Sequence, residues 1–107
     1  MKRISVYVPK MAAIEAISPA YRLFKTANQF LMASGNEPAF QVEYVGLENV
    51  ISTNDGEYSV KIDRLISEVS QTDLVIIPAL YGNMNTAIEA NFEAINWVKT
   101  CMKMVQK

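Results

Sequence analysis

The chain has 107 residues, enough for one compact domain and too few for two ordinary ones. Half of the residues are hydrophobic and 20% are charged, with 10 basic and 11 acidic side chains, so the composition is globular and lacks the excess positive charge that nucleic-acid phosphates require. One cysteine and no histidine exclude an internal disulfide, the usual zinc sites and any Ser-His or Cys-His nucleophile pair within these residues.

The amino-terminal apolar run, from Ile4 to Val8, is interrupted by Ser5 and ends at Pro9, which is too short for the core of a signal peptide. Its β-branched and aromatic side chains predict a first strand instead. No stretch approaches the ~18 to 20 uninterrupted apolar residues that span a bilayer, because charged residues recur along the chain. We therefore expect a cytoplasmic protein that makes no membrane contact.

A loop containing Glu15 follows the first strand, and Ser18 with Pro19 predicts the start of a helix. A Ser hydroxyl can cap free amides, and Pro is tolerated at the first helical position. The helix should run to about Ser34, with Gly35 in the left-handed conformation after it. Apolar residues at spacings of three and four predict one face packed on a sheet: Tyr21, Leu23, Phe24, Ala27, Phe30 and Leu31.

The segment from Phe40 to Val45 alternates apolar and polar side chains, which predicts an edge or near-edge strand. Residues 50–60 predict a small hairpin, because Asn54-Asp55-Gly56 can supply the positive φ angles of a tight turn between two short extended pieces. The next apolar residues have the spacing of a short amphipathic helix: Ile62, Leu65, Ile66 and Val69.

The strand from Leu74 to Ile77 is continuously apolar and is closed by Pro78, as expected for a central parallel strand covered on both faces. Thr86 with Glu89 forms a capping box, which predicts the start of the last helix. That helix carries a long apolar stripe at helical spacing: Ile88, Phe92, Ile95, Val98, Met102 and Val105.

This order of elements predicts a parallel α/β sandwich with right-handed crossovers. Only three parallel strands are expected, so the strand over residues 74–77 would have an unpaired side unless another segment covers it. The chain therefore looks like part of a larger sheet. Its 107 residues alone should self-associate, exchange elements or aggregate through that side.

Ligands in such sheets bind beyond the carboxyl ends of the strands, where two loops of this chain qualify. The loop over residues 9–17 places Glu15 among apolar neighbours, where burial would make its carboxylate useful as a proton donor or acceptor. An exposed carboxylate is the structural alternative for Glu15, and a helix cap is the alternative for an Asn of the second loop. That second loop supplies the other candidate ligand-binding residues: Tyr81, Gly82, Asn83 and Asn85.

Cys101 follows Trp97 by about one turn of the last predicted helix, and neither an activating base nor a strained turn is indicated near it. We therefore interpret it as a half-buried structural thiol. The sequence predicts no catalytic residue, no metal site and no cofactor.

Several segments, in this order, resemble the amino-terminal half of the class I glutamine amidotransferase-like (ThiJ/PfpI) superfamily. Within it, the chain is most similar to the branch that serves as the sensory domain of AraC-type transcriptional regulators. The resemblance implies a three-layer α/β sandwich with a parallel, flavodoxin-like sheet, of which residues 1–107 form only the N-terminal portion. The segments are the opening strand with Pro9, Ile14-Glu15-Ala16-Ile17-Ser18-Pro19 before a helix with Phe24 and Ala27-Asn28, the strand at 40–45, the turn within 52–60, and Asp73 to Pro78.

In the superfamily, an acidic residue after the first strand approaches a reactive cysteine on a sharp strand-to-helix turn. The resemblance places Glu15 at the position of the acid, whereas the cysteine would belong to a strand after the last helix, so Cys101 is not that nucleophile. Members also tend to have glycine directly after the proline of the central strand, where backbone amides can face a developing oxyanion. Here Ala79-Leu80 stand in that place and glycine follows only at Gly82, which favours the non-catalytic regulator branch.

The resemblance therefore implies a fragment of a non-catalytic, ligand-sensing and dimerising domain of an AraC-type regulator. Its partners would be an unknown small-molecule effector and a second copy of the protein. DNA would be bound only through a helix-turn-helix domain that residues 1–107 do not supply. Two alternatives stay open: a fragment of a ThiJ/PfpI-type amidase, protease, glyoxalase-like enzyme or stress protein, and a complete small α/β interaction module.

Overall fold

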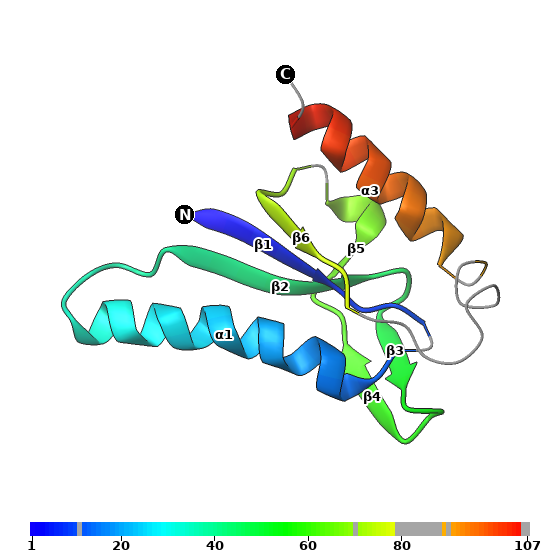
Figure 1. The fold of residues 1–107 in the computed structure, drawn as a ribbon, viewed down its shortest axis with the longest axis horizontal. Coiled ribbons are helices and arrows are strands. Elements are labelled where there is room, and N and C mark those ends of the chain that lie inside the picture. The colour runs from blue at the N-terminus through cyan, green and yellow to red at the C-terminus, as the bar shows by residue number, and fades with distance from the viewer. Residues whose placement is uncertain (11, 70, 79–88, 90, 106–107) are drawn as a thin grey trace.

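The computed structural model describes residues 1–10, 12–69, 71–78, 89 and 91–105, with side chains as far as residue 99 (Figure 1). Four parallel strands form one sheet in the order β5-β2-β1-β6, and β3 and β4 form an antiparallel hairpin. The elements are β1 (Lys2–Tyr7), α1 (Ile14–Ala33), β2 (Phe40–Gly46), β3 (Val50–Thr53), β4 (Tyr58–Lys61), β5 (Arg64–Leu65), the 3-10 turn η1 (Ile66–Glu68), β6 (Leu74–Ile76) and α3 (Phe92–Val105).

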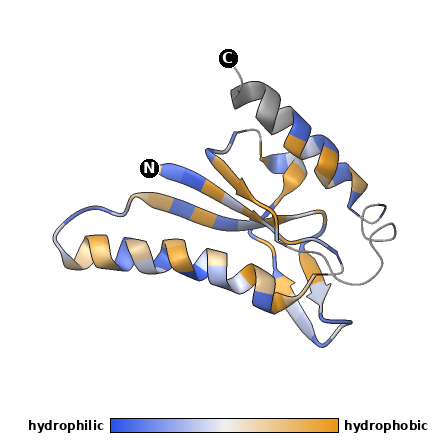
Figure 2. Cartoon of the chain, viewed as in Figure 1, coloured by the Kyte–Doolittle hydropathy of each residue, from blue (hydrophilic) through white to orange (hydrophobic). Residues whose placement is uncertain are grey.

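The sheet lies between α1 on one face and α3 with η1 on the other, which confirms the expected α/β sandwich (Figure 1). β1 pairs with β2 and β6, and helices cover both faces of the sheet, so the side chains of β1 from Ile4 onwards are buried on both faces. Ile4 and Val6 pack in the cluster under α1, whereas Tyr7 packs with the α3 residues Ala94 and Trp97. Figure 2 shows the matching change along β1 from a hydrophilic start to a hydrophobic end.

Helix α1 begins at Ile14, four residues before the start expected at Ser18. The reason is a cap from a distant segment, because the Ile14 amide donates to Asn54 Oδ1 at 2.9 Å and the Asn54 amide donates to the Ala12 carbonyl at 3.0 Å. Pro19 consequently lies inside the helix and not at its first position. The expectation for the other end is confirmed, since Gly35 has a φ of 83° after the last turn.

The expected packing of α1 is confirmed for one side of the helix. Ile17 is fully buried, the Tyr21 ring stacks on Tyr44 with centroids 4.1 Å apart, and Phe24 meets the Phe40 ring edge to face at 5.0 Å. Two of the residues that were expected on this face, Leu23 and Phe30, are exposed.

The hairpin is also confirmed, with positive φ angles at Asn54, Asp55 and Gly56. The amphipathic helix expected over residues 62–69 is wrong. Residues 64–65 form the short strand β5 beside β2, and only the single turn η1 follows. The apolar residues of this segment are buried nonetheless: Ile62, Ile66 and Val69 all lie in the core although they do not share a continuous helix.

The strand β6 is parallel to β1, as expected, but it is the last strand of the sheet within the described residues. The expected burial on both faces is not found there, since Leu74 and Ile77 are exposed. In α3 the buried side chains are Ala94 and Trp97, whereas Phe92 and Ile95 of the apolar stripe are exposed. The capping residue Thr86 lies outside the described residues.

Neither α1 nor the described part of α3 combines the length and the apolar character that a membrane-crossing helix needs.

Candidate functional site at the carboxyl ends of β1 and β6

The candidate site follows from the order of the strands. From β1 the chain crosses to β2 on one side of it and later to β6 on the other side, so the direction of winding reverses between β1 and β6. Ligands in open parallel sheets bind in the crevice outside the carboxyl ends of the strands at such a reversal. In this chain those strand ends are Tyr7 and Ile76.

A groove of about 260 Å³ lies at this point. Most of the described residues that line it are aliphatic, and the others are polar Asn91, the Tyr7 ring and exposed Lys99. The first strand, the residue after β6 and the amino-terminal half of α3 all contribute to it. The lining residues are Tyr7, Pro9, Ile77, Asn91, Ala94, Ile95, Val98 and Lys99.

The buried side chain of Asn91 joins the start of α3 to the end of β1. Its Oδ1 accepts hydrogen bonds from the Tyr7 hydroxyl and from the Lys10 amide, both at 2.8 Å. Its Nδ2 donates to the Lys10 carbonyl at 3.1 Å. Since these bonds connect residues more than eighty positions apart, Asn91 fixes α3 against the loop that leaves β1.

Burial raises the pKa of the Tyr7 hydroxyl, and the nearby Glu93 carboxylate raises it further. The phenol is therefore held neutral and acts as a hydrogen-bond donor to Asn91. A neutral, bonded hydroxyl at the base of the groove suits ligand binding better than proton transfer at ordinary pH.

The raised pKa of Tyr7 predicts a loss of stability in alkali. Above about pH 10 the unfolded chain ionises its tyrosines while folded Tyr7 keeps its proton, so the unfolded state binds fewer protons and the free energy of unfolding falls as pH rises. We expect Tyr7→Phe to lower this free energy by about 1 to 2 kcal/mol at neutral pH, since Asn91 loses one buried donor. The variant should also lose less stability than the wild type in alkali.

Urea unfolding at neutral pH and in alkali measures both effects. The free energy of unfolding of Tyr7→Phe should still fall somewhat as pH rises, because burial also raises the pKa of Tyr44. Tyr58→Phe, at an exposed position on the hairpin, is the matched control and should leave both values unchanged. If Tyr7→Phe and the wild type lost the same free energy of unfolding in alkali, Tyr7 would not be the cause of the alkaline loss.

Glu15 does not line the groove. It lies in the first turn of α1, it is exposed, and its Oε1 accepts a hydrogen bond from Asn54 Nδ2 at 2.8 Å. The apolar surroundings expected for this carboxylate are therefore not found in the described structure. The other candidate residues lie outside the described residues: Tyr81, Gly82, Asn83 and Asn85.

Tyr7 and Asn91 are not among the site residues that the sequence predicts. Tyr7 is expected only as part of the first strand. Asn91 directly precedes α3, a position at which Asn is common, but the last helix was expected to start at Thr86, so Asn91 fell inside the expected helix. No local pattern indicates that the Asn91 side chain also reaches the loop after β1.

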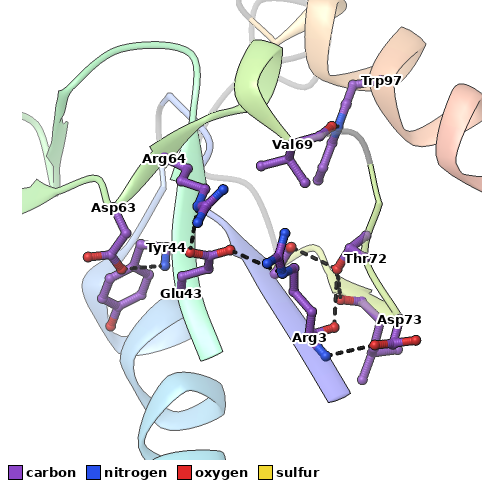
Figure 3. Close-up of polar contacts among 11 residues, drawn as sticks. Arg3, Glu43, Tyr44, Asp63, Arg64, Val69, Thr72, Asp73 and Trp97 are labelled. Atoms are coloured by element: carbon purple, nitrogen blue, oxygen red, sulfur yellow. Dashed lines mark hydrogen bonds and ion pairs between the residues drawn. The ribbon is translucent and has the colours of Figure 1, made fainter. Parts of the chain in front are cut away.

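A second polar cluster surrounds Glu43 near the start of β1 (Figure 3). Glu43 is only 7% exposed, and its carboxylate lies between Arg64 Nε at 3.1 Å and Arg3 Nε at 3.9 Å. Ser5 and Thr72 share a hydroxyl hydrogen bond of 2.8 Å in the same region. Two arginines around one buried carboxylate compensate its charge, which indicates a structural role in joining β1, β2 and β5.

Two aspartates define where β5 and β6 begin (Figure 3). Asp63 accepts from the Tyr44 amide at 2.8 Å, and Asp73 accepts from the Arg3 amide at 2.7 Å. Each carboxylate therefore takes the place of a strand partner at the end of a ladder. In the part of the chain that the structure describes, no group of three or more acidic, cysteine or histidine side chains has an arrangement that could hold a metal ion.

The described fold is similar to several solved structures. It matches a protein from Vibrio parahaemolyticus that is assigned as a transcriptional regulator, with a TM-score of 0.75 and 16% identity over 96% of this chain. It matches a DJ-1 superfamily protein from Agrobacterium tumefaciens with a TM-score of 0.60 and 14% identity over 99% of this chain. It matches an AraC family transcriptional regulator from Pseudomonas putida with a TM-score of 0.55 and 12% identity over 90% of this chain.

These matches confirm, at the level of the fold, the resemblance to ThiJ/PfpI-type domains and to AraC-type regulators. The chain spans 52%, 50% and 60% of the lengths of these three structures, so it corresponds to about half of each. No family model and no curated protein matches the sequence.

Proposed function

We propose that this chain forms part of the ligand-sensing and dimerising domain of an AraC-type transcriptional regulator and has no catalytic activity of its own. The observation that carries the proposal is an apolar groove at the reversal point of a fold shared with two regulators. The chain spans about half of the matched structures, and in this proposal the DNA-binding part belongs to a longer protein and lies outside residues 1–107.

The chemistry of the groove supports binding over catalysis. Among the described residues that line it, the only hydroxyl, thiol or carboxylate is the neutral Tyr7 phenol, which is bonded to Asn91. Aliphatic walls favour a ligand with an apolar body, and Lys99 at the groove favours a negatively charged group on it. A small organic acid with an aliphatic or aromatic body is therefore the effector class that we propose.

Two measurements test the proposed function. The native protein, isolated from its own cells, should have an intact mass well above 12.0 kDa and should bind DNA upstream of its own gene. Addition of aromatic and aliphatic carboxylic acids, tested singly, should change that DNA affinity for at least one compound. A native mass near 12.0 kDa, or DNA binding that no compound changes, would count against a ligand-sensing regulator.

A fragment of a ThiJ/PfpI-type enzyme is the second candidate, and the match to a DJ-1 superfamily protein favours it. Glyoxalase and amidase assays on the native protein distinguish the two. Activity that survives removal of the DNA-binding part would favour the enzyme over the regulator.

A further inference from the structure

We propose that the β1–α1 connection, residues 10–13, couples the groove to the β3–β4 hairpin. A ligand bound in the groove would then change how firmly the hairpin turn and the start of α1 are held. This inference deepens the proposed function, because it assigns a regulatory output to the same groove, and it rests on that function for its ligand. The coupling itself belongs to the chain and can be measured without a ligand.

The groove side of the connection is held by one asparagine. Asn91, which lines the groove, accepts from the Lys10 amide at 2.8 Å and donates to the Lys10 carbonyl at 3.1 Å. The Tyr7 hydroxyl, which also belongs to the groove, donates to the same Asn91 Oδ1. A ligand in the groove would therefore contact the side chains that fix Lys10.

The hairpin side of the connection is held by a second asparagine. The Asn54 amide donates to the Ala12 carbonyl at 3.0 Å, and Asn54 Oδ1 accepts from the Ile14 amide at 2.9 Å. Asn54 Nδ2 also donates to the Glu15 carboxylate. Figure 1 shows the hairpin beside the start of α1. The connection thus lies between the groove and the hairpin turn and is bonded to both.

The side chains of the connection itself contribute little to holding it. The buried ones among its described residues are Ala12 and Ala13, which bury little apolar area. Lys10 forms an ion pair with Glu48 at 2.9 Å, but both side chains are exposed, so this pair adds little stability. We therefore expect the bonds of the two asparagines to decide between a held and a locally opened connection, so that each asparagine biases the same equilibrium.

The hairpin turn is in a conformation that needs support. Asn54 and Asp55 have φ angles of 53° and 56°, in the left-handed region that Asn and Asp adopt more readily than other side chains but still at a cost. The bonds from Asn54 to the connection and to Ile14 help to offset this cost. Opening of the connection would therefore also let the turn change its conformation.

Hydrogen exchange of the native protein, resolved to single amides, tests the coupling without a ligand. In Asn91→Ala the Lys10 amide loses its acceptor. The Ile14 and Asn54 amides, whose acceptors remain in place, should nevertheless exchange at least about tenfold faster. The coupling is reciprocal, so Asn54→Ala should likewise speed exchange at Lys10.

Asn28→Ala is the matched control. The Asn28 side chain also bonds main-chain groups of a distant segment, the Phe40 amide at 3.0 Å and the Phe40 carbonyl at 2.7 Å, but it lies in the second half of α1. This variant should speed exchange at Phe40 and leave Lys10 unchanged. Slow exchange of the Val6 amide, in the buried part of β1, verifies that each variant is folded.

Unchanged exchange at Ile14 and Asn54 in Asn91→Ala overturns the coupling. An equal increase at these amides in Asn28→Ala also overturns it, because it would show a general loss of stability. If fast exchange at Val6 shows that Asn91→Ala is unfolded, Tyr7→Phe takes its place, since it removes one bond to Asn91 and should produce a smaller increase at the same amides.

The effect of a ligand separates this inference from the proposed function. A carboxylic acid that changes the DNA affinity of the native protein should also slow exchange at Ile14 and Asn54, because binding beside Asn91 stabilises the held connection. A DNA response without this slowing overturns the coupling and leaves the regulator. Coupling among the variants in a protein that responds to no such acid supports the connection and overturns the regulator.

Discussion

Replacement of both arginines beside Glu43, in the double variant Arg3→Met/Arg64→Met, is expected to lower the free energy of unfolding by about 3 kcal/mol. Glu43 is almost completely buried, and the two Nε atoms are the charged groups that compensate its carboxylate. Without them a buried charge stays unpaired. The value is at the lower end of the range for broken buried pairs, because both arginines are themselves partly exposed to solvent.

Urea unfolding at neutral pH measures this loss. The matched control adds Glu43→Gln to the double variant, which removes the unpaired charge while keeping the shape of the side chain, and it should recover most of the lost stability. Each single arginine variant should lose less than half as much as the double variant, since one guanidinium would remain. A double variant as stable as the wild type would show that solvent reaches the carboxylate.

Asn91→Ala is expected to produce a loss of similar size, about 2 to 4 kcal/mol, because it leaves one buried group and two partly buried groups without this partner. The Tyr7 hydroxyl, the Lys10 amide and the Lys10 carbonyl all bond to this one side chain. The start of α3 would also lose its connection to the loop after β1, so the groove should change shape together with the stability.

A double-mutant cycle with Tyr7→Phe tests the reason for the loss. In the wild type, Tyr7→Phe should be destabilising. In the Asn91→Ala background the hydroxyl already lacks its acceptor, so the same change should be neutral or stabilising. Additive losses in the double variant would contradict a direct link between the two side chains.

Several elements could be predicted because their causes are local. The hairpin depends on residues that tolerate positive φ at Asn54 to Gly56, and the end of α1 depends on Gly35 in the same way. The first strand and the parallel strand after Asp73 depend on short apolar, β-branched runs. These features need no information from distant parts of the chain.

The errors have a common physical origin, which is competition from distant partners. Asn54 of the hairpin caps α1 and moves its start to Ile14. Asp63 bonds to β2 through its side chain and its amide, so the following residues pair as β5 instead of continuing a helix. Neither contact leaves a periodic pattern in the sequence.

The candidate site, too, was predictable only in the part that depends on local sequence. Its position at the carboxyl ends of the strands could be predicted from the order of the elements. The residues that line the groove could not, since Tyr7 and Asn91 are 84 positions apart and meet only after the sheet and α3 are assembled.

The sequence by itself therefore determined the α/β class, the hairpin, three of the four parallel strands and the lack of nucleophile pairs within these residues, because propensity, periodicity and composition act within a few residues. The tertiary structure alone decided which side of α3 is buried, where α1 starts and which side chains surround the groove. Those outcomes depend on hydrogen bonds and packing between segments far apart in the chain, and their energies exceed the local preferences that the sequence displays.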